Sequence, residues 1–92
     1  MIIEHAGREY DTAEAPRWVP LVAISLAVSR LPATETPEAL AADLAPWAQR
    51  MAAMYDCPPE GAGWIAAVAL AEFADRKAGQ RMVQAYAARF GV

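Results

Sequence analysis

Glu72 and Asp75 are the two residues whose types and spacing come nearest to a chemical site. They are one helical turn apart, and paired carboxylates can exchange a proton or hold a metal ion. A metal site needs further ligands, however, and the sequence places no histidine near this pair. The simpler interpretation is that this turn faces solvent and that Glu72 forms an ion pair with Arg76, four residues later. We therefore predict no catalytic or metal-binding role for the two carboxylates.

The only histidine and the only cysteine, His5 and Cys57, also lack the neighbours that catalysis requires. His5 falls in a predicted hairpin turn and is expected to be exposed, and a histidine-based triad or metal centre would need further members. Cys57 has no obvious base beside it and no second cysteine to pair with, so we expect a buried turn residue and not a nucleophile. The sequence thus predicts a protein that is not an enzyme and needs no cofactor or metal.

Aromatic and apolar residues are abundant for a chain of 92 residues, of which 57% are hydrophobic. A domain of this size buries only part of its surface, so some apolar area is expected to stay exposed, and exposed apolar patches are typical contact sites. Trp18, Trp47 and Trp64 are most simply core residues, although tryptophan also dominates interface hot spots. The sequence therefore favours a small adaptor or regulatory protein that acts through protein–protein contact, with another protein or a second copy as partner. The candidate partner-binding residues are Trp64, Met82, Tyr86 and Phe90.

Residues 47–67 resemble a helix-turn-helix motif in the spacing of their apolar positions. In that motif Ala52 is the small residue that lets the helices approach, Cys57 is the apolar residue of the turn, and Asp56 stands where glycine is usual. A DNA-binding regulator is therefore the alternative function. Its outward positions, however, offer no basic or amide side chain that could contact bases or phosphates, so nucleic-acid binding is not expected. These positions are Pro58, Pro59, Glu60, Gly63, Trp64 and Ala67.

The first secondary-structure element predicted along the chain is a β-hairpin over residues 2–12. A two-residue loop would set Glu4 opposite Glu9, which is repulsive. A three-residue loop with Gly7 in the left-handed conformation sets Glu4 opposite Arg8 and Ile2 opposite Tyr10. We predict the three-residue loop.

Two helices are predicted in the middle of the chain. The first spans about 20–31, with Pro20 in its first turn, and it is apolar on all sides, so we expect it to be buried. The second spans about 37–55, with Thr36 as its N-cap and Pro37 at its first position. Its apolar positions stay in phase across Pro46, which predicts one kinked helix.

The last third of the chain predicts helices at about 62–77 and 80–90. An unbroken helix would be roughly 40 Å long, whereas a domain of this size has a radius of gyration near 13 Å, so we expect a break at Gly79. The apolar stripe of the last helix either packs on the body beside Trp47 or is held out for a partner. We expect it to be chiefly core, so that Phe90→Ala lowers stability by several kcal/mol. The stripe consists of Met82, Val83, Tyr86 and Phe90. The whole chain, 1–92, is then a single mainly α domain, a small bundle of three to four helices with a short N-terminal β-hairpin.

Charge is distributed unevenly along the chain, whose net charge is −3. The segment after Asp75 carries +4, and the segment up to and including Asp75 carries −7. An acidic total argues against general nucleic-acid binding, and the basic end is most simply docked on its own body. Neither an apolar run of about 20 residues nor a signal peptide is recognisable, so we expect a cytoplasmic protein with no membrane contact.

Overall fold

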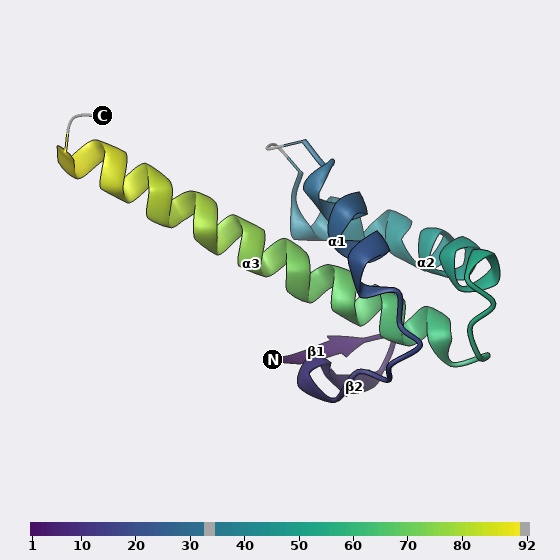
Figure 1. Ribbon diagram of the computed structural model, residues 1–92. Coiled ribbons are helices and arrows are strands. Elements are labelled where there is room, and N and C mark those ends of the chain that lie inside the picture. Colours follow the sequence, from purple (N-terminus) through teal and green to yellow (C-terminus); the bar gives the residue numbers. More distant parts are fainter. Residues whose placement is uncertain (33–34, 91–92) are drawn as a thin grey trace.

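The long helix α3, Gly61–Phe90, is the axis to which the other elements attach (Figure 1). In the computed structural model residues 1–32 and 35–90 are described, the side chains of residues 37, 77–88 and 90 excepted. The strands are β1, Ile2–His5, and β2, Arg8–Asp11; a 3₁₀ turn, η1, spans Thr12–Glu14; α1 spans Leu21–Ser29 and α2 spans Pro37–Met54. The protein is thus mainly α with an N-terminal hairpin, as predicted.

The core is built around the first half of α3. In Figure 1, α1 and α2 lie against one side of this half and the hairpin lies against the other. Ile24 of α1, Leu44 of α2 and Ile65 of α3 have almost no exposed surface. Alanines at several α3 positions let these neighbours approach closely, because a methyl group takes little space between packed helices. Ala66, Ala67 and Ala69 are all buried.

Helix α3 continues without interruption across Gly79, so the predicted break is wrong. One glycine in a helix costs only about 1 kcal/mol, and the residues around it are mostly good helix formers. The molecule is longer than a compact domain of this size because the end of α3 does not fold back. Figure 1 shows its last turns extending past the other elements, and the molecule measures 49 × 24 × 23 Å.

Helix α2 has the start that the sequence predicts. The Thr36 side chain accepts a hydrogen bond from the Ala39 backbone N–H at 3.2 Å, and Pro37 occupies the first turn. The helix also continues through Pro46. Its apolar stripe stays in phase, so Leu44, Ala48 and Met51 all face the core.

The hairpin register differs from the prediction. Glu4 lies opposite Glu9 and Ile3 lies opposite Tyr10, with a two-residue loop in which Ala6 and Gly7 both have positive φ values, 51° and 78°. Such a loop matches the natural twist of a hairpin. The two glutamates are exposed to water, where their repulsion is weak, whereas this register puts the half-buried Ile3 opposite the buried Tyr10, on the side that faces the core. Burial of apolar side chains on this face outweighs an exposed pair of like charges.

Candidate functional site

Helix α1 buries only one side, which corrects the expectation of a fully buried helix. Ile24 and Val28 face the core, whereas Leu21 is 53% exposed, Val22 75% and Leu26 53%. Ser25 and Ser29 are exposed on the same side. We call the set Leu21, Val22, Ser25, Leu26 and Ser29 the α1 outward face. It contains no charged residue, and no element of the described chain covers it.

Residues at the end of α2 extend this apolar surface. Met54 is 75% exposed and Tyr55, which follows α2, is 49% exposed. Tyr55 and the first turns of α1 together form a shallow groove of about 480 Å³. Its lining residues are Val19, Pro20, Leu21, Val22, Ala23, Leu26 and Tyr55. The α1 outward face and Tyr55 are therefore parts of one apolar surface.

A second cavity lies between α1 and α2, with Ala69 of α3 among its lining residues. Its volume of about 240 Å³ is below the range typical of small-molecule sites, which is roughly 300–1,000 Å³. Leucine side chains and Trp47 line it, and the charged residues Glu35, Asp43 and Arg50 also contribute. This cavity can hold one apolar side chain of a partner but little more.

The first turns of α3 are covered by the hairpin. The rings of Tyr10 and Trp64 pack edge to face, with centroids 5.1 Å apart and planes at 70°. A Cβ on Gly63 would overlap the Tyr10 hydroxyl, and Ala67 is fully buried. Three of the positions predicted to face outward in a helix-turn-helix thus contact this chain itself. The DNA-binding alternative gains no support from this end of α3.

The turn between α2 and α3 nevertheless has the predicted local structure. Asp56 adopts a left-handed conformation, with φ of 53°, in the place where glycine is usual. The Cys57 backbone N–H donates to the Ala52 carbonyl at 2.9 Å, and the half-buried Cys57 thiol lies 4.0 Å from the Trp18 carbonyl oxygen. Cys57 therefore fills the inside of a turn, as expected.

Arg76 has a structural role that the sequence did not predict. Its guanidinium donates to the Val28 carbonyl at 2.7 Å and to the Leu31 carbonyl at 2.8 Å. Among the described residues no ion pair joins Arg76 to Glu72, so the predicted pair is wrong. The last carbonyls of a helix have no partner within the helix and carry partial negative charge, so a cation is stabilising there. Arg76 ties the middle of α3 to the end of α1.

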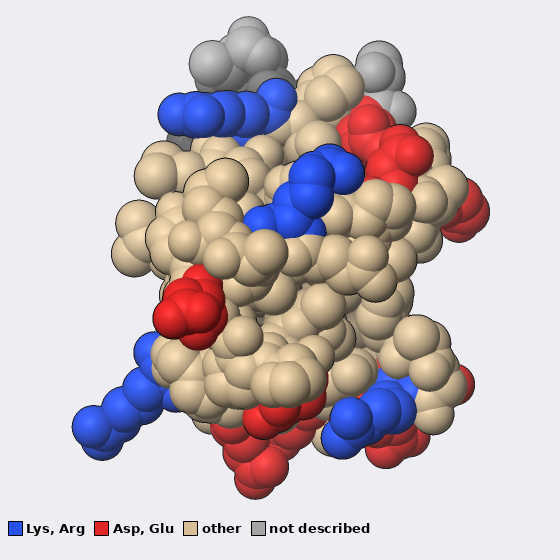
Figure 2. Space-filling model, turned by 90° about the vertical axis from the view of Figure 1, so that its right-hand side faces the viewer, with Lys and Arg blue, Asp and Glu red and all other residues tan. Residues whose placement is uncertain are grey.

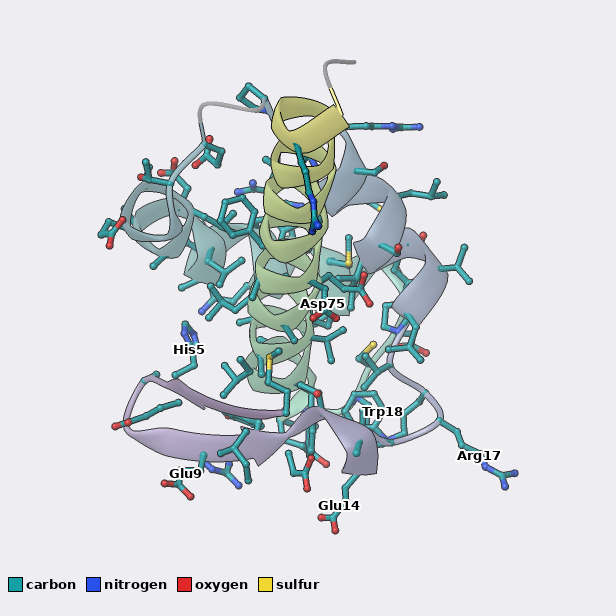
Figure 3. All side chains as sticks on the ribbon, turned by 90° about the vertical axis from the view of Figure 1, so that its left-hand side faces the viewer. His5, Glu9, Glu14, Arg17, Trp18 and Asp75 are labelled. Carbon is teal, nitrogen blue, oxygen red and sulfur yellow. The ribbon has the colours of Figure 1, made fainter. Side chains whose placement is uncertain are left out.

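The remaining polar residues do not gather into a site. Figure 3 shows Glu9, Glu14 and Arg17 pointing away from the body, and His5 lying apart from Asp75. Within the described residues no three histidine, cysteine or acidic side chains are close enough to hold a metal ion. Figure 2 shows scattered charged side chains with broad uncharged areas between them. No helix, over its described residues, is long and apolar enough to cross a membrane.

The predicted partner-binding residues are only partly placed by the structure. Trp64 is half-buried, and its ring is already in contact with Tyr10. The side chains of Met82, Tyr86 and Phe90 lie outside the described residues, so their predicted packing stays a prediction. Sequence reasoning missed the α1 outward face. The signal for it was present, because Ser25 and Ser29 are four residues apart and mark one side of an otherwise apolar helix.

Comparisons with known proteins gave no relative. No family model matches this chain, and neither the curated proteins nor the solved structures include a significant match to it. A function must therefore be argued from the surface itself.

Proposed function

We propose that this chain is a small non-enzymatic adaptor or regulatory protein that binds a protein partner through the α1 outward face. The supporting observation is the exposure of Leu21, Val22 and Leu26 on one uncharged helix side. Each square ångström of apolar surface removed from water is worth about 25 cal/mol, so covering this side is favourable for any partner of matching shape.

The shape of this surface fits a helix. An exposed helix side with apolar residues at positions i, i+1 and i+5 offers a ridge and a groove into which the side chains of a second helix can pack. Tyr55 lines the groove, and its aromatic ring suits an interface anchor. The exposed Met54 beside it is flexible and adapts to a partner surface.

The test is capture of binding proteins from the native host by the purified chain and by two variants. Leu26→Glu places a charge on the α1 outward face, and Ala42→Glu places the same charge on an exposed position of α2. Both sites are in contact with water, so both variants should melt like the parent. The proposal predicts proteins that the parent and Ala42→Glu both retain and that Leu26→Glu loses. Equal retention by all three forms would reject this face as the contact surface.

A further inference from the structure

The cavity between α1 and α2 combines an apolar interior with charged residues of both signs. Its volume is about 240 Å³, and the charged residues that line it are Glu35, Asp43 and Arg50. Asp43 and Arg50 are exposed and Glu35 is half-buried, whereas the lining residues Leu44 and Ala69 are buried. The charged groups therefore lie at the mouth of the cavity, and the apolar groups lie inside it.

The charged groups at the mouth have no partner within the described part of the chain. No ion pair or side-chain hydrogen bond there involves Glu35, Asp43 or Arg50. Asp43, Trp47 and Arg50 occupy positions i, i+4 and i+7 of α2, so they share one side of the helix. Long side chains of a helix lean toward its N-terminus, so the Arg50 guanidinium can extend over Trp47 toward Asp43. The mouth thus offers two carboxylates and one guanidinium to a ligand.

We propose that this cavity binds a free α-amino acid with an apolar side chain the size of that of leucine, methionine or phenylalanine. The side chain of the ligand occupies the cavity beside Trp47. Its ammonium group contacts Glu35 or Asp43, and its carboxylate contacts Arg50. The inference goes beyond the proposed function, because it concerns another surface and a small molecule.

The volume of the cavity fits an apolar side chain of this size. An engineered protein cavity of about 150 Å³ binds benzene, so 240 Å³ holds an isobutyl, thioether or benzyl group. Glycine and alanine would leave most of the space unfilled and would bury little apolar surface. The cavity is smaller than the sites of drug-sized ligands, which agrees with a ligand no larger than one amino acid.

The charges at the mouth favour a zwitterion over other small apolar ligands. An apolar carboxylic acid would contact Arg50 but would be repelled by Glu35 and Asp43, and an alkylamine would leave Arg50 without a partner. In an α-amino acid both charged groups are bonded to the carbon that carries the side chain, so both remain at the mouth when the side chain is inside. Contacts between exposed charges are weak. We therefore expect a dissociation constant on the order of 1 mM.

The decisive experiment compares leucine with compounds that have the same isobutyl group but lack one of its charges. Isopentylamine lacks the carboxylate, isocaproic acid lacks the ammonium, and leucinamide keeps the ammonium but has a neutral amide. Each is added to the full chain at up to about 20 mM, well above the expected dissociation constant. Proton–nitrogen NMR follows the indole N–H signal of Trp47, assigned with Trp47→Phe. Leucine should shift this signal saturably, and each analogue should bind about threefold more weakly or worse.

Substitutions at the mouth test the role of each charge. Arg50→Met should weaken leucine binding about threefold and leave isopentylamine binding unchanged, because the amine has no carboxylate. The double variant Glu35→Gln and Asp43→Asn should weaken the binding of both compounds. The matched control is Glu38→Gln, which removes an exposed acidic group of α2 that does not line the cavity, and it should change neither.

Two further variants test where the ligand binds. Ala27 lines the cavity and is half-buried, so Ala27→Leu should fill the space and abolish leucine binding. Leu26→Glu changes the α1 outward face and should bind leucine like the parent, so this inference and the proposed function are tested independently. The melting temperature of each variant verifies folding, and the substitutions at the mouth test the inference without relying on Ala27→Leu.

Four results would overturn the inference. The first is the absence of a Trp47 shift at the highest leucine concentration. The second is equal binding of leucine, isopentylamine and isocaproic acid, which would mean an apolar cavity that does not select amino acids. The third is leucinamide binding as tight as that of leucine, which would assign the cavity to the amino terminus of a peptide. The fourth is a leucine-induced shift that a folded Ala27→Leu variant retains, which would place the ligand elsewhere.

Discussion

Helix α1 and the first half of α3 are alike in composition and differ in the elements that surround them. Neither has a charged residue over 21–29 or over 61–71. Helix α3 has α1, α2, β1 and η1 packed around it, and its residues 65–69 are all buried. Helix α1 has α3 on one side and nothing from the described chain on its outward face. Apolar composition therefore predicts that burial of a helix is favourable. The number of neighbouring elements decides whether that burial is complete within one chain.

The sharpest contrast between the two helices is expected from alanine substitutions at Ile65 and Val22. Ile65 is fully buried, so Ile65→Ala should lower the free energy of unfolding by about 2–5 kcal/mol. Val22 is mostly exposed, so Val22→Ala should change it by no more than about 0.5 kcal/mol in dilute solution. Denaturant unfolding at low protein concentration measures both. Similar losses at the two positions would mean that α1 is as buried as α3.

The next largest loss of stability is expected when the link between α3 and α1 through Arg76 is removed. Arg76→Met removes two charge-assisted hydrogen bonds to the end of α1, and hydrogen bonds to charged groups are worth about 1.5–3 kcal/mol. We expect a loss of about 2 kcal/mol by chemical denaturation. Arg76→Lys should recover part of it, because one ammonium group cannot reach both carbonyls as a planar guanidinium does. The matched control is the exposed Arg50→Met, and a loss there as large as for Arg76→Met would contradict this role.

A smaller loss is expected where the hairpin covers α3. Gly63→Ala places a methyl group against the Tyr10 hydroxyl, so the hairpin must move, at a cost of about 1–2 kcal/mol. In a Tyr10→Ala background the same change should be neutral or stabilising, because alanine favours a helix over glycine by about 1 kcal/mol. A double-mutant cycle on thermal unfolding measures the coupling. The absence of coupling would show that the hairpin does not rest on Gly63.

The smallest effect concerns the cap of α2. Thr36→Ala removes the hydrogen bond to the Ala39 N–H and should cost about 1 kcal/mol. Thr36→Ser keeps the hydroxyl and should stay close to the parent in the same thermal unfolding experiment. An alanine variant that melts like the parent would mean that the cap does not contribute to stability.

Local features of the fold were predictable from the sequence where a residue acts on its immediate neighbours. Thr36 and Pro37 define the start of α2, and Asp56 adopts the left-handed conformation expected of the turn. Features that depend on distant packing were not predictable. The hairpin register follows the packing of Ile3 and Tyr10 on the side that faces α3, and α3 crosses Gly79 because the helical cost of one glycine is small.

The candidate site was predicted least well, for a physical reason. The sequence shows that residues 21–29 are apolar but does not show how many elements pack around them. Ser25 and Ser29 mark the outward side, yet two serines are also tolerated in buried helices. Arg76 likewise has acidic neighbours on its own helix, and only the fold shows that the carbonyls of Val28 and Leu31 lie within reach.

The central claim is that the α1 outward face is a contact surface and not part of the core. The most direct test measures the unfolding free energy and the association of Leu26→Glu on the same preparation. The account predicts an unfolding free energy within about 0.5 kcal/mol of the parent at low concentration, together with loss of binding to the partner or to a second copy. A loss of stability above about 2 kcal/mol would show that Leu26 belongs to the core. Unchanged stability with unchanged association would show that the face contacts only water, and either result contradicts the claim.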